Sequence, residues 1–203
     1  MVMLPVPVAD VSVSDEALVA RARRGNHEAF EDLVARYQGR IYRLAMRMSH
    51  NADDAEEITQ EAFLHAYRSL GTFEGQARFG TWLYRIAMNE ALMRRRASRR
   101  RPSVSLEDLS ARMGDAFLAS RSTGTDELVG EKGLVQRVRE AMAHLDEAHR
   151  AALVLHDLEE LSSEEAADIL GVSADTVRQR AHRARIALRE LLEPLDVRTS
   201  RRT

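Results

Sequence analysis

Arginine accounts for all but one of the 30 basic residues of this chain, and it is concentrated in two segments. Residues 78–101 contain eight arginines and a single acid, Glu90, and residues 175–189 contain five arginines and a single acid, Asp175. The net charge of the whole protein is only −2. Because a guanidinium group binds phosphate through two parallel hydrogen bonds, two such clusters in a nearly neutral protein predict phosphate binding at two separate places.

The second arginine segment follows a pattern typical of a helix-turn-helix. Ser162 and Glu165 have the spacing of a capping box, Gly171 fits the turn, and Ser173 can cap the next helix. In that next helix four apolar residues share one face: Val177, Ala181, Ala184 and Leu188. Four basic residues share another: Arg178, His182, Arg185 and Arg189. A solvated charged face is the alternative for a lone basic helix, but the turn pattern beside this one favours a DNA groove as its partner.

The first arginine segment combines cations with aromatic rings. The rings lie one after another along the chain: Phe73, Phe79, Trp82 and Tyr84. Arg78 and Arg85 are placed among them. Aromatic faces beside guanidinium groups suit unstacked bases, which predicts contact with a single strand. Burial of the rings in a core is the alternative, and composition alone favours it.

Six further arginines end this segment, Arg94 to Arg96 and Arg99 to Arg101. Cations at the end of a helix complement its dipole, so part of the cluster has a structural explanation. Six in a row of eight residues exceed that need, and their mutual repulsion indicates a polyanionic partner.

The elements that position these residues are predicted to be helices. One amphipathic helix has these residues on one face: Phe30, Leu33, Val34, Tyr37, Ile41, Leu44, Ala45 and Met48. Asn51 is the predicted cap of a helix over residues 52–70. That helix is expected to bury Ile58, Ala62, Phe63, Ala66, Tyr67 and Leu70. After a glycine-containing loop, Thr81 is the predicted cap of a third helix, whose apolar positions include Trp82, Leu83, Ile86, Ala87 and Met93.

Composition predicts an all-α fold with two small helical domains. Alternating valine-rich runs and Asn-Gly or Asp-Gly turns are absent from the sequence. We expect a disordered tail over residues 1–14, a first domain over 15–101, a flexible acidic linker over 102–133, a helix-turn-helix domain over 134–193 and a tail over 194–203. The sequence has no cysteine, no apolar run long enough to cross a membrane and no signal peptide, so we expect a cytoplasmic protein without membrane insertion.

Three runs in one order carry a family resemblance. Residues 54–64 (DAEEITQEAFL), 81–89 (TWLYRIAMN) and 171–185 (GVSADTVRQRAHRAR) are similar to the polymerase-clamp helix, the −10-reading helix and the −35 reader of extracytoplasmic-function (ECF, group 4) sigma factors of the sigma-70 family. The resemblance covers about residues 15–192 and implies a first domain, σ2, that melts and holds the −10 strand. It implies a last domain, σ4, that reads the −35 duplex.

The resemblance also implies roles for single residues. The residues expected at the −10 element are Phe73, Arg78, Phe79, Trp82, Arg85, Asn89, Arg94, Arg95 and Arg96, with Asn89 on an extruded base. The residues expected at the −35 element are Ser173, Thr176, Arg178, Gln179, His182, Arg183 and Arg185. The residues expected to contact polymerase are Asp54, Glu57, Gln60 and Glu61.

The partners that the resemblance implies are core RNA polymerase, through its β′ clamp and β flap, promoter DNA and an anti-sigma factor. The implied function is initiation of transcription of a stress or envelope regulon, with no cofactor and no metal. A helix-turn-helix regulator that acts without polymerase is the alternative. An enzyme is disfavoured, because His149 and His156 are two helical turns apart, too far to share a metal, and no phosphate-loop or nucleophile motif occurs.

Overall fold

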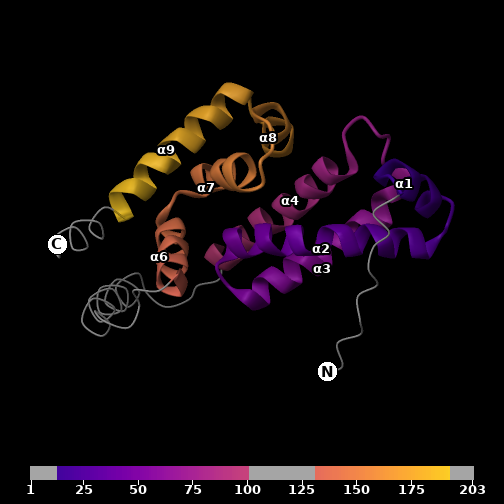
Figure 1. The fold of residues 1–203 in the computed structure, drawn as a ribbon, viewed down its shortest axis with the longest axis horizontal. Helices are drawn as coiled ribbons and strands as arrows, with labels where there is room; N and C mark the ends of the chain where they lie inside the picture. The colour runs from indigo at the N-terminus through magenta and orange to yellow at the C-terminus, as the bar shows by residue number, and fades with distance from the viewer. Residues whose placement is uncertain (1–12, 101–130, 193–203) are drawn as a thin grey trace.

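The computed structural model describes residues 13–100 and 131–192, with the side chains of 98–100 and 131–135 left aside, and within these residues it contains helices and no strand (Figure 1). The all-α prediction is therefore confirmed. The expected tails and almost all of the expected linker lie outside the described residues. None of the described helices combines the length and the apolar character that crossing a membrane requires.

The first helical unit contains α1 (Asp15–Arg23), α2 (His27–Ser49), α3 (Ala52–Ser69), the short 3-10 helix η1 (Leu70–Thr72) and α4 (Phe79–Arg100). Side chains cap the first three helices, because Ser14, Asn26 and Asn51 each accept a backbone N–H from the first turn. The apolar faces of α2, α3 and α4 then meet in one core, in which Leu33, Ile41 and Leu44 are among the fully buried side chains.

The helix that carries the aromatic segment begins earlier than the sequence pattern predicts. α4 starts at Phe79, and the Trp82 N–H already donates to the Arg78 carbonyl at 3.1 Å. Thr81 is therefore a buried residue of the first turn and not the cap. Gly80 also belongs to the helix, and a Cβ there would lie 3.0 Å from the ring of Tyr37. This close approach explains why a glycine occupies the first turn.

The second helical unit contains α6 (Glu131–His144), α7 (Glu147–Leu153), the π-helical turn η2 (Val154–Leu158), α8 (Ser163–Leu170) and α9 (Ala174–Leu192). Its helix-turn-helix is confirmed in detail. Ser162 and Glu165 form a reciprocal capping box, and Gly171 ends α8 in the left-handed conformation at φ 64°. The Ser173 hydroxyl then accepts the Thr176 N–H at 3.2 Å, which starts α9 directly after the turn.

Two apolar residues that the sequence pattern assigns to the core are exposed in the structure. Tyr67 is 45% exposed and Met93 is 61% exposed. Tyr67 lies at the edge of the α3 face, where its ring packs edge-on against Phe30 and its hydroxyl contacts His27. Met93 points away from the core face of α4, which continues through Ala91.

The two units pack against each other through one continuous buried cluster. α8 contacts α4, and η2 contacts α2. We call this interface between the two units the seam. Its centre is apolar, and buried polar groups lie around that centre. The position of the two units relative to each other is therefore set by a packed interface over the described residues.

Candidate nucleic-acid interface

Trp82, Arg85 and Asn89 follow one another at intervals of about one helical turn and form a stripe along the outer face of α4. Arg85 and Asn89 are exposed, and Trp82 lies one turn before them, half-buried. The opposite face holds Leu83 and Ala87 at 0% exposure. The side chains of the stripe are thus held by a helix whose other face is fixed in the core, a rigid arrangement for reading bases.

The aromatic residues form a cluster beside this stripe, and its members differ in how deeply they are buried. The rings of Phe73 and Trp82 lie 4.9 Å apart between centroids, and the ring of Phe79 lies 5.7 Å from Trp82 and 5.5 Å from Tyr37. Phe79 is only 4% exposed, so it supports the cluster from the core. Phe73 and Trp82 are half-buried and line an open pocket of about 430 Å³.

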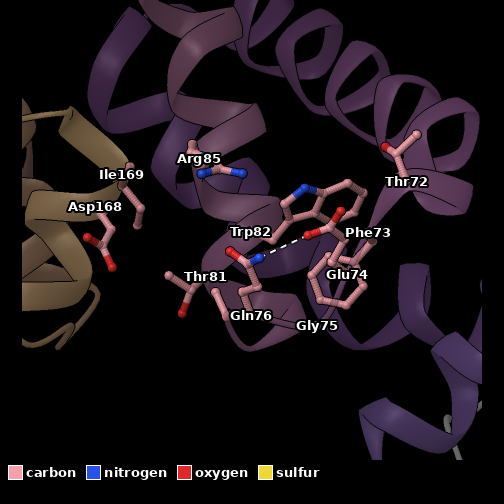
Figure 2. A pocket seen from close by; sticks show the side chains of 11 residues that line it. Thr72, Phe73, Glu74, Gly75, Gln76, Thr81, Trp82, Arg85, Asp168 and Ile169 are labelled. Carbon is pink, nitrogen blue, oxygen red and sulfur yellow. Dashed lines mark hydrogen bonds between the residues drawn. The ribbon is translucent and has the colours of Figure 1, made fainter.

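The pocket lies between the first unit and the second. Figure 2 shows the loop after η1 and the start of α4 on one side, with Phe73, Gln76 and Trp82, and α8 on the other, with Asp168 and Ile169. A hydrogen bond of 2.9 Å from Gln76 to Glu74 orders the loop. Arg85 lines the pocket and is exposed, and Arg78 is exposed directly after Ala77, another lining residue. Apolar ring faces and free guanidinium groups around a base-sized hollow suit an unstacked nucleotide.

The arginines at the end of α4 differ in their surroundings. Arg94 donates to Asp54 at 2.7 Å and pairs with Glu57, and the bond to Asp54 is the main cause that raises the pKa of Arg94. Arg95 lies 3.6 Å from Glu147 and 3.4 Å from the Met48 carbonyl. Arg96 is exposed. Two of the three arginines expected on phosphate are therefore bound to protein groups in this arrangement.

The acidic start of α3 presents a polar surface on the same unit. Glu57, Gln60 and Glu61 are exposed, and Asp54 is half-buried beside Arg94. Ala55 and Ile58 on the other face are buried in the core. The structure thus brings together all four residues expected to contact polymerase.

The basic face of α9 is open to solvent. Arg178, Gln179, His182, Arg183 and Arg185 are all exposed, while Val177, Ala181 and Ala184 are buried beneath them. Ser173 and Thr176 lie at the start of the helix, with their hydroxyls 2.8 Å apart. The division of this helix into two faces is as the sequence predicts.

Two of these arginines have acidic neighbours. Arg178 pairs with Asp175 in its own helix and lies 3.6 Å from Glu164 in α8, and Arg185 lies 3.5 Å from Asp157. Exposed pairs of this kind contribute little to stability, so they can be exchanged for phosphate or base contacts.

Sequence patterns gave no indication of the polar groups buried at the seam. Arg150 has 0% exposure and donates to four backbone carbonyls, those of Met48, Met142, Ala143 and Leu145. Three of these carbonyls lie in the last turns of α2 or α6, where carbonyls have no partner within the helix. One guanidinium therefore caps two helix ends, and this explains an arginine in an apolar run.

Glu159 is the acidic counterpart at the seam. Its side chain is 5% exposed, it pairs with Arg47, and it accepts the Tyr84 hydroxyl at 2.6 Å. Burial, followed by the bond to Glu159, raises the pKa of Tyr84, so the hydroxyl remains a donor. Asp157 and Glu160 flank it in the sequence, so charge alone does not distinguish the buried Glu159 from its neighbours.

His50 lies at the same end of α2 in the left-handed conformation, at φ 60°, and both of its ring nitrogens are buried without a hydrogen-bond partner. Burial, followed by the charges of Arg95 and Arg139, lowers the pKa of His50. The imidazole is therefore neutral near pH 7.

Comparison with known proteins gives these surfaces a context. Residues 33–101 match the family Sigma-70 region 2, and residues 135–188 match Sigma-70, region 4. The chain is 39% identical over 184 residues to the RNA polymerase sigma-H factor of Pseudomonas aeruginosa, an alignment that covers 89% of this chain and 95% of the relative. It is 37% identical over 187 residues to the ECF RNA polymerase sigma-E factor of Escherichia coli K12, covering 90% and 96%.

A solved structure agrees with these relatives. CnrH, in its complex with the cytosolic domain of CnrY, superposes with a TM-score of 0.66 at 29% identity, over 89% of this chain and 98% of that one. A regulator that acts without polymerase does not fit these matches, and sigma factors are initiation factors, not enzymes. With a region 2, a region 4 and full-length relatives of this kind, the chain belongs to the ECF sigma factors of the sigma-70 family.

Proposed function

We propose that the two arginine segments bind promoter DNA in two different states. Residues 15–101 act as σ2 and hold the melted −10 strand, and residues 134–193 act as σ4 and read the −35 duplex, with residues 102–133 as the linker. The observation that carries this proposal is the exposed stripe of α4 beside an aromatic pocket, together with a separate, exposed basic face on α9.

At the −10 element we assign Asn89 to an extruded base, because its short amide is exposed on a rigid helix. Phe73 and Trp82 form the wall against which a base stacks, and Phe79 supports that wall from the core. Arg78, Arg85 and Arg96 are exposed for the strand backbone. Arg94 and Arg95 join them once they leave their present acidic partners.

At the −35 element the exposed residues of α9 enter the major groove. Ser173 and Thr176 stand at the helix N-terminus, where hydroxyl and N–H groups favour phosphate, and Arg178, Gln179, His182 and Arg183 have the positions for base edges. Arg185 lies one turn further along, at a phosphate.

Arg178→Ala should cost about 1–3 kcal/mol of −35 recognition, and the cost should fall on one base pair. A guanidinium that makes two bonds to a guanine loses them only at that position. The measurement compares transcription by the holoenzyme from promoters changed one base pair at a time across the −35 element. An equal loss on every promoter would identify Arg178 as a phosphate contact and contradict the assignment.

We further infer that the acidic face of α3 binds the β′ clamp of core polymerase, through Asp54, Glu57, Gln60 and Glu61, and that σ4 contacts the β flap. CnrH is solved with a CnrY domain, and by analogy we propose an anti-sigma factor as a partner of this chain. Because core polymerase and promoter DNA are its proposed partners, we place the protein in the cytoplasm.

Glu61→Lys should weaken binding to core polymerase about tenfold, which corresponds to roughly 1.4 kcal/mol, because it places a cation where the clamp expects a carboxylate. The measurement is fluorescence anisotropy of the labelled full chain titrated with core enzyme. Glu31→Lys makes the same change at an exposed site on α2 and should leave the affinity unchanged. Equal affinities of the Glu61 and Glu31 variants would exclude the clamp assignment.

The experiment that tests the function as a whole is transcription by bacterial core polymerase with and without this chain, on fragmented genomic DNA, followed by sequencing of the transcripts. We expect start sites preceded by two shared sequence elements about two helical turns apart. Transcripts that begin at the same positions without the protein would contradict the function.

A further inference from the structure

We propose that the arrangement described above is a closed, self-inhibited state, in which α8 covers the −10 pocket and Glu159 holds the two units together. The inference rests on the proposed −10 function of the pocket. Core polymerase or melted DNA must then open the seam before the chain can act.

The closed state holds its two reading helices too close together for a promoter. α8 contacts both α4 and α9, so one helix separates the −10 helix from the −35 helix. Two steps of helix packing amount to roughly 16–20 Å. Two helical turns of DNA span about 70 Å. The two units must therefore separate before both elements can be bound by one chain.

α8 also occupies one wall of the −10 pocket. Asp168 and Ile169 line it opposite Trp82, as Figure 2 shows, and Thr81 in the first turn of α4 lies 3.4 Å from Glu165. Glu165 is the acid of the α8 capping box, so the same carboxylate caps the start of α8 and contacts α4. A base stacked against Trp82 would share this limited space with α8.

The charge of this covering segment opposes that of DNA. From residue 157 to residue 168 there are six acids and no arginine or lysine: Asp157, Glu159, Glu160, Glu164, Glu165 and Asp168. The Asp168 carboxylate of α8 lines the same pocket as Arg85, where the phosphates of a melted strand are expected. At physiological salt, charges within about 8 Å repel with little screening. The strand and α8 therefore compete for one surface.

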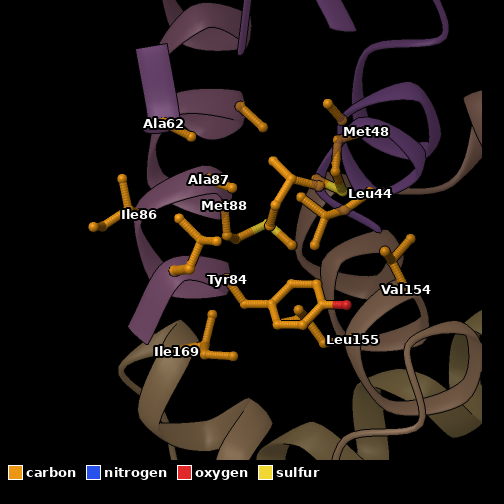
Figure 3. Close-up of a cluster of buried hydrophobic side chains, with 14 of the residues drawn as sticks. Leu44, Met48, Ala62, Tyr84, Ile86, Ala87, Met88, Val154, Leu155 and Ile169 are labelled. Atoms are coloured by element: carbon orange, nitrogen blue, oxygen red, sulfur yellow. The ribbon is translucent and has the colours of Figure 1, made fainter. Parts of the chain in front are cut away.

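Glu159 binds two partners of the first unit across the seam. Its buried carboxylate binds Arg47 of α2 and the Tyr84 hydroxyl of α4, and Arg47 also donates to the Leu158 carbonyl at 3.3 Å. The π-helical turn of η2 leads directly into it, through a 2.9 Å bond from the Glu159 N–H to the Val154 carbonyl. Figure 3 shows the apolar layer beneath, where Tyr84 and Met88 meet Leu155 and Ile169.

This interface has the properties of a switch. A carboxylate that loses Arg47 and Tyr84 in place would be a buried, unpaired charge, so the closed state needs both partners at once. In the open state water hydrates the Glu159 carboxylate, so the loss of Arg47 and Tyr84 leaves no buried, unpaired charge. Arg95, which contacts Glu147 across the same seam, is released for phosphate by the same movement.

The test compares Glu159→Gln with Glu160→Gln in the full chain. Both remove one negative charge, but Glu160 is exposed and its neighbour Glu159 is buried at the seam. The probes are the radius of gyration from small-angle X-ray scattering and the affinity for a single strand of 12 random nucleotides. The strand is followed by fluorescence of Trp82, the one tryptophan of the chain. Tyr84→Phe removes the other side of the contact without a change in charge.

We expect E159Q to increase the radius of gyration and to bind the strand about tenfold more tightly than the wild type, because apparent affinity scales with the fraction of open molecules. E160Q should match the wild type, and Tyr84→Phe should show the same changes as E159Q to a smaller degree. A radius and an affinity that are equal in E159Q, Tyr84→Phe and wild type would overturn the closed state. A larger radius with unchanged, measurable affinity would overturn the covering role of α8.

A different result would distinguish a failure of this inference from a failure of the proposed −10 function of the pocket. If E159Q opens the chain but neither the wild type nor any variant binds the strand or changes Trp82 fluorescence, the −10 assignment of the pocket is wrong, and the covering role of α8 falls with it.

Discussion

Arg150→Met should lower the free energy of unfolding by about 2–6 kcal/mol. The guanidinium donates to four carbonyls at 2.8–3.2 Å, and methionine fills a similar volume without any donor. A buried carbonyl left without a donor costs about 1–3 kcal/mol, and this applies to Ala143 and Leu145, since the Met48 and Met142 carbonyls keep a second donor in Arg95 and the Leu145 N–H. A buried charged residue can sometimes be replaced without loss, but only when both partners become apolar, and here the carbonyls of the backbone remain.

Three of the four acceptors, Met142, Ala143 and Leu145, belong to the same unit as Arg150, so the loss should persist even when the two units separate. Urea unfolding followed by circular dichroism at 222 nm measures it. Arg137→Met makes the same change at an exposed position of α6 and should alter stability by less than about 0.5 kcal/mol. Unfolding free energies of the two variants within that margin of each other would show that Arg150 is not a cap.

Asn89→Ala should reduce formation of the open promoter complex about 5- to 150-fold, the equivalent of roughly 1–3 kcal/mol for one lost base contact. Asn89 is exposed on α4, and alanine favours helix more than asparagine, so the fold and core binding should be retained. The measurement is permanganate reactivity of unpaired thymines in complexes of the holoenzyme with a promoter found by transcript sequencing.

The matched control is Glu90→Ala, the next residue along the helix, which contacts His65 and has no proposed role in DNA binding. It should form open complexes as the wild type does. An equal loss in both variants, or a parallel loss of core binding in the Asn89 variant, would indicate damage to α4 instead of a missing base contact.

Local sequence signals predicted the helices because the interactions that begin and end them are local. Ser162 with Glu165 and Ser173 with Thr176 lie three residues apart, and each pair is bonded as the pattern predicts. Helical periodicity was less reliable at the edges of a face, where Tyr67 and Met93 are exposed. It also placed the start of α4 at Thr81, because Arg78, the residue before the true start at Phe79, is not of a type that usually caps a helix.

The exposure of the candidate site residues was predictable from the sequence, and their contacts with other residues were less so. Asn89, Arg178 and Glu61 are exposed on helices whose other faces are buried, and that follows from the spacing of apolar residues alone. The burial of Phe79 under Trp82 and Phe73 was not predictable in the same way, because a ring in an amphipathic segment can face a core or a ligand with the same spacing.

The sequence by itself determined the all-α fold, the helix-turn-helix and the two places where arginine gathers, because caps, turns and periodicity act over a few residues. Only the tertiary structure decided which charges meet. Arg94 with Asp54, Arg47 with Glu159 and Arg150 with the Met48 carbonyl join residues 40, 112 and 102 positions apart. Such pairs depend on how whole helices pack. The packing buries Arg150 and the Glu159 carboxylate between the two units and leaves the basic face of α9 exposed.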